Sequence, residues 1–556
     1  MCAESYKLVD ADVLVVGGGA AGCLAALAAG QQGSRVVLVE KAGSISRSGN
    51  LASGIDHFQA ILGEAPWDTP DEYLAGLAAS NDGLIDLKVA AVYAREVGAC
   101  VRYLEEIGFP FRDPATGKYR RVAGLGGKHP RSINFEGGAV KQVLAREVNR
   151  LSVKVVESVA VSDLLTQGER VVGALGFHVR KRDFYVFRAQ AVVMATGGVV
   201  RYYPTPCGLP YLTHHSPYNT GDGHAAAYRA GASFCNMEFT YCSVVPKDFS
   251  APGITGFVGL GGKITNALGD RYMTKYHPWG ENAPRNAIVN GTLTEIRAGR
   301  GPCYVDCRHL SPQDIELVKI GIANERPTLL DYLAMRGIDP ARDPIEFEPQ
   351  ELEVGVTFAN GAGSGLVIQE DCATTLAGLY AAGDCANVSF AASGAGTLGF
   401  RAGAQAATFA SKAPRANLDE TQVREHMDRV IAPFGRQGEV TPGEFEAKLR
   451  KVMQDYVGFV RNRKGLETAL GALGRLREHS RRLGATDGHE LMRASEAISL
   501  LQVAELTARA ALTREESRAV PAHFRADFPE RDEKWRGFIV LKKQGDATSV
   551  AFEALD

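Results

Sequence analysis

Residues 12–22 read DVLVVGGGAAG, and this stretch decides the fold that the sequence predicts. Four of its first five residues, VLVV at 13–16, are apolar and mostly β-branched, which indicates a buried strand. Gly17, Gly19 and Gly22 follow with the spacing G-x-G-x-x-G. In a dinucleotide-binding turn the first glycine allows the sharp bend, the second lets the backbone approach a pyrophosphate, and the third lets helix and strand pack closely.

A helix of small residues and a second strand complete the predicted unit. Ala20 and Ala21 begin the helix, whose N-terminal N–H groups would face the phosphates. The run RVVLVE at 35–40 is a second strand, and it ends in Glu40, which is placed to accept the ribose hydroxyls. Lys41 follows at the same edge. A glycine turn that opens an ordinary βα unit is the alternative, but it does not account for Glu40. We therefore predict a Rossmann-like α/β domain that binds a dinucleotide.

Three later segments favour FAD over NAD as that dinucleotide. AVVMATGGVV (191–200) is a strand that enters a glycine turn, TGDGHAAAYRAGA (220–232) is a turn and helix, and GLYAAGD (378–384) is a strand that ends in an acid. The acid could hold the ribityl or pyrophosphate region. The predicted FAD contacts in these segments are Ala195, Thr196, Gly197, Gly198, Asp222, Gly383 and Asp384.

A fourth segment, SGAGTLGFRAGAQAATFA (393–410), is expected to be a glycine-rich turn that enters a small-residue helix. It also matches G-x-G-x-x-G, but no strand comes directly before it, which disfavours a second nucleotide site. We expect the helix N-terminus to face the electron-rich C2=O end of the flavin, where its dipole would stabilise the reduced anion. Gly396, Thr397 and Leu398 are predicted FAD contacts here.

Composition excludes several other classes of function. The chain has 556 residues, a formal net charge of −2 and a pI near 6.7, so nothing suggests a nucleic-acid partner. No basic-then-apolar leader and no apolar run of roughly 20 residues is present, so we expect a cytoplasmic protein without direct membrane insertion. The ten cysteines include no C-x-x-C pair, so we expect no metal or iron–sulfur cluster within this chain.

These segments together resemble the flavoprotein subunits of the fumarate reductase/succinate dehydrogenase superfamily, and look most like the α-subunit of adenylylsulfate (APS) reductase. Arg47, Ser48 and Gly54 in KAGSISRSGNLASGIDHF (41–58) match the flavin-contacting R-S-x-x-x-x-x-G element of the family. Gly49 stands where quinone-linked succinate dehydrogenases carry a covalently flavinylated His. The resemblance therefore implies non-covalent FAD. Stretches at 69–111 and 522–538 also resemble the family.

The resemblance also implies the domain organisation. We expect a Rossmann-like FAD-binding domain with an inserted α+β capping domain and a C-terminal helical domain. The expected limits are 1–237 and 355–410 for the two parts of the FAD-binding domain, 238–354 for the capping (substrate) domain, 411–518 for the helical domain and 519–556 for a C-terminal tail.

The substrate machinery of the family is only partly matched. Arg285 stands at the position of the proton-donating arginine and could instead clamp a carboxylate, sulfite or phosphate. A second interpretation is that Arg285 caps its helix and pairs with Glu281. The dicarboxylate-binding groups of fumarate reductases are missing near 240–248, 256–262, Asn360 and Thr397, so neither fumarate nor succinate is expected to be the substrate.

Histidines supply further candidates for catalysis. His57 is a candidate acid or base because it lies close to the flavin element, although a lone His is more often a structural hydrogen-bond partner. The neighbours His214 and His215, and His224 further on, lie between two flavin-binding segments and could face the ring. The sequence does not decide which of the four does.

The sequence leaves three functions open. The first is an FAD-dependent oxidoreductase that acts on a small anionic substrate at flavin N5 and exchanges electrons with a separate ferredoxin-like iron–sulfur protein, in a possible hetero-oligomer. The second is reduction of an activated C=C bond of the fumarate reductase type. The third is an electron-transfer subunit without its own substrate. A stand-alone NAD(P)H-dependent reductase is disfavoured, because no second nucleotide-binding βαβ unit is evident.

Overall fold

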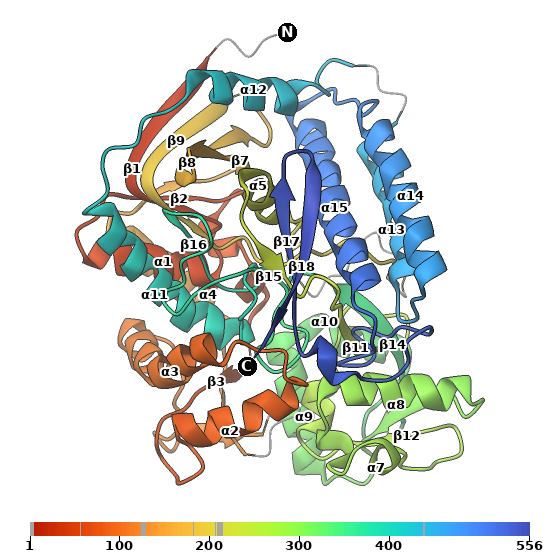
Figure 1. The fold of residues 1–556 in the computed structure, drawn as a ribbon. Helices are drawn as coiled ribbons and strands as arrows, with labels where there is room; N and C mark the ends of the chain where they lie inside the picture. Colours follow the sequence, from red (N-terminus) through yellow and green to blue (C-terminus); the bar gives the residue numbers. More distant parts are fainter. Residues whose placement is uncertain are drawn as a thin grey trace.

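The computed structural model describes residues 5–55, 57–123, 129–181, 183–205, 207, 215–436 and 440–555. The chain forms an α/β body, an inserted α+β unit and a set of C-terminal helices, as the sequence predicts (Figure 1). Among the described residues, none of the helices is both long enough and apolar enough to cross a membrane.

The body is built on a seven-stranded sheet with the order β6-β2-β1-β9-β8-β7, and one further strand, β16, pairs with β9. The pairs β1–β2, β1–β9, β2–β6 and β9–β16 are parallel, whereas β7, β8 and β9 form an antiparallel meander. The strands are β1 (Tyr6–Val16), β2 (Val36–Val39), β6 (Lys154–Val156), β7 (Val159–Gln167), β8 (Arg170–His178), β9 (Phe184–Met194) and β16 (Leu379–Ala381).

The central strand β1 shows why this sequence forms a parallel sheet. Val13, Leu14 and Val15 are completely buried, because helices cover both faces of a parallel sheet and the strand reads as a continuous apolar run. Val13 pairs with Val36 of β2 on one side and with Ala191 of β9 on the other. The two apolar strands predicted at 35–40 and within 191–200 are therefore direct neighbours of β1.

Helices rich in small residues pack on this sheet, namely α1 (Ala20–Gln31), α5 (Asp222–Ala230) and α11 (Ala391–Ala410). Three further helices pack on other helices: α4 (Val140–Arg150) on α1, α3 (Leu87–Ile107) on α11, and α2 (Pro70–Ser80) on α3. The helices α1 and α11 approach very closely, because Gly399 and Gly403 of α11 face the backbone of Ala21 and Ala25. A small three-stranded sheet lies beside them, with the order β3 (His57–Gln59), β5 (Ser132–Asn134), β4 (Arg120–Val122).

The inserted unit, which we name the cap, runs from β11 to β14 and has its own apolar core (green in Figure 1). Its sheet is antiparallel with the order β11-β14-β13-β12. Its elements are β11 (Tyr241–Pro246), α6 (Ile254–Val258), β12 (Lys263–Thr265), α7 (Met273–Tyr276), α8 (Arg285–Arg297), β13 (Cys303–Asp306), α9 (Pro312–Glu325), α10 (Pro327–Met335) and β14 (Ile345–Glu353).

The C-terminal part begins with α12 (Glu420–Ile431), which is teal in Figure 1 and packs on β7 and β8. It continues along one side of the body, in blue, with α13 (Pro442–Val457), α14 (Arg463–Ser480) and α15 (Gly488–Thr513), followed by a hairpin of β17 (Gly537–Gln544) and β18 (Ala547–Ala554). The hairpin extends a second sheet through the short strands β10 (Phe234–Cys235) and β15 (Gly365–Leu366). Arg514 and Glu238, both fully buried, form an ion pair of 2.7 Å that ties this tail to the body.

Candidate functional site

A cavity of about 1150 Å³ lies where the body meets the cap. Gly17 follows β1, Glu40 follows β2, Thr196 follows β9 and Asp384 follows β16, and all four line the cavity. These strands are parallel, so their carboxyl ends meet at one edge, which is where open α/β sheets bind their ligands. Residues far apart in the sequence therefore form one site because of the sheet order.

Most of the residues predicted to contact the cofactor line this cavity, and some do not. Those that line it are Gly17, Gly19, Ala20, Ala21, Glu40, Lys41, Gly49, Gly54, Ala195, Thr196, Gly197, Asp222, Gly383 and Asp384. Those outside its lining are Gly22, Arg47, Ser48, Gly198, Gly396, Thr397 and Leu398. Both candidate catalytic residues, Arg285 and His57, line it as well.

The glycine turn has the close contacts that its spacing requires. Gly17 has φ of +100°, and a Cβ there would lie 2.4 Å from the carbonyl oxygen of Ala195. A Cβ on Gly22 would lie 1.8 Å from the carbonyl oxygen of Gly17, so Gly22 serves helix packing and does not face the cavity. The carboxylate of Glu40 accepts hydrogen bonds from the backbone N–H of Gly18 at 2.6 Å and of Ala42 at 2.7 Å. A carboxylate has further lone pairs to accept ribose hydroxyls.

The side chain of Lys141 stabilises this glycine turn from the side opposite the cavity, and the sequence did not predict this role. The side chain is fully buried in α4, and its ammonium donates to the carbonyl oxygen of Gly18 at 2.6 Å. It also lies 3.3 Å from the sulfur of Cys23 in α1. The only signal in the sequence is a lysine on the apolar face of an amphipathic helix, and that signal does not identify its partner.

The segment 45–54 shapes the next part of the wall. It contains two short 3₁₀ turns, η1 (Ile45–Arg47) and η2 (Asn50–Ser53). Arg47 is exposed and does not line the cavity. The hydroxyl of Ser48 donates to the carbonyl oxygen of Gly18 at 3.0 Å, so Ser48 supports the wall without lining it. Gly49 has φ of +70°, and a Cβ there would lie 2.7 Å from the Cα of Gly19.

The prediction of a glycine-rich turn at 393–399 is wrong, because these residues are already helical. Helix α11 begins at Ala391, directly after Phe390, which has φ of +55° and makes the turn itself. Ala391, Ala392 and Ser393 line the cavity, so the first turn of α11 faces it. Gly396 lies against Cys100, Leu24 and Phe58, and the hydroxyl of Thr397 donates to the carbonyl oxygen of Ser393 at 2.8 Å. This is a packing surface, as for the neighbouring Leu398, which is buried.

Lys41 and Asp222 meet each other at the cavity wall. The ammonium of Lys41 lies 2.6 Å from the carboxylate of Asp222 and 3.0 Å from that of Glu496 in α15. Arg201 forms an ion pair of 2.9 Å with the same Glu496. This buried chain of alternating charges holds the C-terminal helices to the nucleotide side of the body.

On the cap side, Arg285 begins α8 and its guanidinium lies over the ring of Tyr241, 4.9 Å from the ring centre. Glu281 does not neutralise it, because that carboxylate accepts two hydrogen bonds from Arg271, at 3.0 and 2.9 Å. Within the described ranges, no carboxylate forms an ion pair with Arg285. The side-chain amide of the adjacent Asn286 donates to the carbonyl oxygens of Phe358 and Ala519, which ties the cap to the body and the tail.

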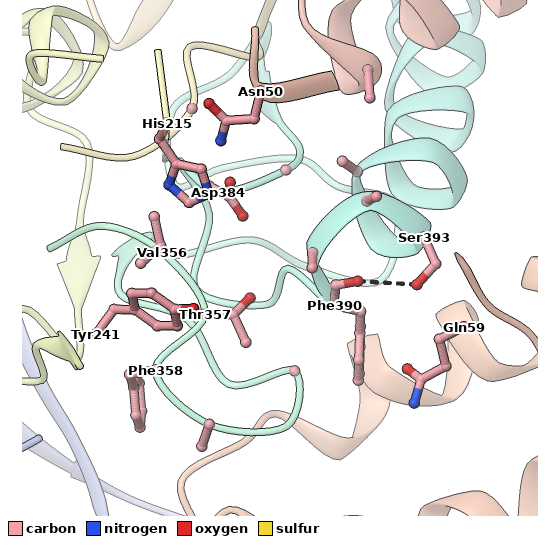
Figure 2. Close-up of a pocket in the computed structure, with 18 of the residues that line it drawn as sticks. Asn50, Gln59, His215, Tyr241, Val356, Thr357, Phe358, Asp384, Phe390 and Ser393 are labelled. Atoms are coloured by element: carbon pink, nitrogen blue, oxygen red, sulfur yellow. Dashed lines mark hydrogen bonds between the residues drawn. The ribbon is translucent and has the colours of Figure 1, made fainter. Parts of the chain in front are cut away.

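The four histidines take different positions. His57 on β3 and His215 line the cavity, and Figure 2 shows His215 beside Asp384 and Asn50. His224 is fully buried in α5 and does not line the cavity, and burial lowers its pKa to about 4. His214 lies outside the described residues. Among the residues described, no group of three His, Cys, Asp or Glu side chains could hold a metal ion.

The polar and apolar groups of the cavity suit a flavin dinucleotide. Glycine backbone forms one end, where a phosphate chain needs close approach, and the helix N-termini of α1 and α11 supply N–H groups. The hydroxyl of Thr196 and one carboxylate oxygen of Asp222 are buried and have no hydrogen-bond partner among the described atoms, so they can bond to a ligand. Aromatic side chains, including Tyr241, Phe358 and Phe390, form the other end (Figure 2).

Comparison with known proteins agrees with this geometry. Residues 12–398 match the family described as FAD binding domain, and residues 446–556 match the family described as fumarate reductase flavoprotein C-term. A fumarate reductase (CoM/CoB) subunit of Methanothermobacter marburgensis is 29% identical over 97% of this chain and 98% of its own length. L-aspartate oxidase of Streptomyces coelicolor is also 29% identical, over 97% of this chain and 93% of its own length.

A solved structure extends the comparison to the whole fold. The structure of adenylylsulfate reductase from Archaeoglobus fulgidus superimposes with a TM-score of 0.89 and 27% sequence identity. The match covers 100% of this chain and 98% of that chain. The cap, the body and the C-terminal helices therefore have the same arrangement in the two proteins.

Proposed function

Because this chain belongs to the FAD-binding flavoproteins of the fumarate reductase/succinate dehydrogenase superfamily, we propose that it exchanges electrons between bound FAD and a small anionic substrate held by Arg285. The chain binds FAD and is an FAD-dependent oxidoreductase. Both general statements were predicted from the sequence and are confirmed. The substrate, its contacts and the electron partner are the proposal.

The single observation that carries the proposal is the environment of Arg285. Its guanidinium lines the cavity and packs on Tyr241, while the nearest candidate acid, Glu281, is bound to Arg271. An arginine fork without a carboxylate partner binds carboxylate, sulfite or phosphate oxygens in a bidentate manner. A charged hydrogen bond of this kind contributes about 1.5–3 kcal/mol.

Bound FAD supplies a two-electron acceptor and donor at its N5 atom. The residues of this chain do the rest. Arg285 would orient the anionic group, and the first turn of α11 would place its N–H dipoles toward developing negative charge. Asn286 would keep the cap closed on the body through its two carbonyl partners, which limits the access of water during the reaction.

Two substrate classes have support. An APS- or sulfite-like anion is supported by the overall fold shared with adenylylsulfate reductase. Reduction of an activated C=C bond is supported by the similar M. marburgensis protein, which is named as a fumarate reductase subunit. We favour the first, because Thr397 stands where fumarate reductases have a substrate-binding arginine, and its side chain is turned into α11 and away from the cavity.

We propose that a separate ferredoxin-like iron–sulfur subunit exchanges electrons with the flavin. The M. marburgensis relative is named as one subunit of its enzyme, which supports a hetero-oligomer of this kind. The alternative is a flavin that only relays electrons between partner proteins. Such a relay binds no substrate, so it does not account for an arginine in the cavity without an acidic partner among the described residues.

The test is an anaerobic visible spectrum of the holoprotein. The photoreduced protein is mixed separately with APS and with fumarate, and the oxidised protein is titrated with sulfite, with and without AMP. We expect APS to reoxidise the flavin and sulfite to bleach it. The variant R285Q should weaken sulfite binding by at least about tenfold. The control R308Q removes another cap arginine, which pairs with Asp306 and does not line the cavity, and it should bind sulfite like the wild type.

Three outcomes would contradict parts of this proposal. Reoxidation by fumarate but not by APS would select the C=C reduction. A flavin that none of these compounds perturbs would favour electron relay. Equal sulfite binding by R285Q and R308Q would show that Arg285 does not contact the anion.

A further inference from the structure

A buried carboxylate and an imidazole form a pair in the cavity wall. Glu353 is the last residue of β14 and is completely buried, and one of its carboxylate oxygens contacts Nδ1 of His215. No hydrogen-bond donor to either carboxylate oxygen is found elsewhere in the described chain. The His215 side chain is 17% exposed and lines the cavity. The pair thus connects the interior of the cap sheet to the flavin site.

The segment that carries His215 is fixed to the flavin side of the cavity. The backbone N–H of Ser216 donates to the side-chain oxygen of Asn50 at 3.0 Å, and the amide of Asn219 lies 3.4 Å from the same oxygen. Asn50 begins η2, directly after Gly49. Figure 2 shows the imidazole beside Asp384, with Asn50 above it. His215 therefore lies among residues that line the predicted FAD site.

The charges around His215 favour its protonated form. Burial by itself lowers the pKa of the imidazole, but the carboxylates of Glu353 and Asp384 raise it more, and Arg326 opposes them weakly, so the net shift is upward from 6.5. The charged groups that face it come from β14, from the loop after β16 and from the junction of α9 and α10. The imidazolium therefore persists above pH 6.5 and is lost as the pH rises through the raised pKa.

We propose that His215 is the acid–base residue of the flavin cavity and that Glu353 is its positioning residue. A buried carboxylate is costly unless it is paired, and here it engages one ring nitrogen and so directs the other, Nε2, away from it. A base that is oriented in this way by a carboxylate is a common arrangement in enzymes. The inference requires bound FAD but not the substrate class or the iron–sulfur partner proposed above.

The proton transfer by His215 needs no reagent other than bound FAD, the substrate and solvent water. A substrate that gains an electron pair, supplied by bound FAD, needs a proton at one of its atoms. His215 would release the proton from Nε2 to that atom and become neutral, and it would take a proton back from solvent water. In the opposite direction Nε2 would accept the proton that the substrate releases as it gives up its electron pair.

The first test measures the flavin itself, without any turnover. The midpoint potential of the bound flavin and the dissociation constant of its sulfite adduct are measured from pH 5 to 9 in the wild type, H215Q and E353Q. The wild type should show a break in the pH dependence of both quantities above pH 6.5. In H215Q the break should vanish, and below pH 6.5 sulfite should bind at least about tenfold more weakly, as expected for the loss of one charged hydrogen bond. In E353Q the break should remain but move to lower pH, since the imidazole loses its main stabilising carboxylate.

Two control variants test whether His215, and not another histidine, causes the break in the pH dependence. H309Q removes an exposed histidine of the cap that lies outside the cavity lining, and it should match the wild type at every pH. H57Q removes the other histidine that the sequence suggested. If H57Q abolishes the break and H215Q does not, His57 is the acid–base residue and the proposal is wrong. An unchanged pH dependence in H215Q with FAD fully bound would also overturn it.

A measurement on the wild type covers the case in which H215Q does not fold. Histidine labelled with ¹³C at Cε1 is followed by NMR through a pH titration of the oxidised and the reduced holoprotein. One resonance should titrate above pH 6.5, and its midpoint should move upward when the flavin gains electrons. If no histidine above pH 6.5 responds to flavin reduction, the proposal fails. Loss of APS or fumarate reactivity with this response intact would instead contradict only the proposed substrate.

Discussion

At the scale of single residues, the site depends on charged side chains whose partners lie far away in the sequence. Arg285 lacks an acidic partner in the described chain because Arg271 occupies Glu281. His215 gains one because the last residue of β14 reaches it. Lys141 and His224 are two further buried groups, and each leads to a separate prediction.

Lys141 is expected to set the affinity for FAD through the carbonyl of Gly18. The substitution K141M keeps the length of the side chain but removes the charged donor of that carbonyl and leaves the weaker hydroxyl donor of Ser48, which costs about 1–3 kcal/mol and loosens the glycine turn. The dissociation constant for FAD, measured by fluorescence titration of the apoprotein, should rise by about tenfold or more. K118M, at an exposed turn, is the control. Equal FAD affinities in the two variants would refute this role.

His224 is expected to make the protein sensitive to acid. It is fully buried, neither ring nitrogen has a hydrogen-bond partner in the described chain, and burial lowers its pKa to about 4. Below pH 6.5 the imidazole of His224 binds a proton in the unfolded chain but not in the folded one. The free energy of unfolding therefore falls as the pH drops from 6.5 to about 4. The loss amounts to at most about 3 kcal/mol.

The variant H224L should remove this part of the acid sensitivity. Free energies of unfolding from urea titrations at several pH values between 4 and 7 should fall less steeply in H224L than in the wild type. Other buried histidines, such as His523, contribute equally to both proteins and cancel in the difference. Parallel pH profiles would show that His224 is not responsible.

At the scale of elements, the crossing of α1 and α11 positions both helix N-termini at the cavity. A Cβ on Gly403 would lie 2.0 Å from the carbonyl oxygen of Ala25, so the backbones touch. The substitution G403A should push the helices apart and destabilise the fold by about 1–3 kcal/mol, with weaker FAD binding. The control G474A lies inside α14, where a Cβ meets nothing within 4 Å, and it should stabilise by up to about 1 kcal/mol.

Thermal unfolding of the two glycine variants distinguishes packing from helix propensity. If G403A and G474A both raise the melting temperature, the fold does not require the close approach at Gly403. The only effect of Gly403 would then be to lower the helix propensity of α11. If only G403A lowers it, the crossing is a packing constraint that the cofactor site shares.

At the scale of the whole molecule, the cavity is lined by segments of the body and of the cap, so FAD bound there should stabilise the entire chain. Gly49 offers no side chain for a covalent link, and its close approach to Gly19 leaves no space for one. Acid precipitation should therefore release the flavin into the supernatant. The melting temperature of the apoprotein should rise with added FAD, and the free energy of unfolding should grow by about 1.4 kcal/mol per tenfold excess over the dissociation constant.

A flavin that stays with the precipitated protein would show a covalent link to another residue. A melting temperature that does not depend on FAD concentration would mean that binding and folding of this chain are not linked.

The sequence by itself determined the nucleotide-binding half of this protein. The run 12–22, Glu40 and the strands that end at Thr196 and Asp384 are local patterns, because strands, glycine turns and helix starts depend on neighbouring residues. Sheet order then brings their carboxyl ends to one cavity. The family followed from the same motifs.

Only the tertiary structure decided the remainder of the site. The predicted turn at 393–399 is helical because Phe390 supplies the bend and leaves α11 to pack on α1. The support of Gly18 by Lys141 spans 123 residues, and that of His215 by Glu353 spans the whole cap insertion. Pairing between buried charges depends on which elements meet in space, and no local pattern of residues specifies that.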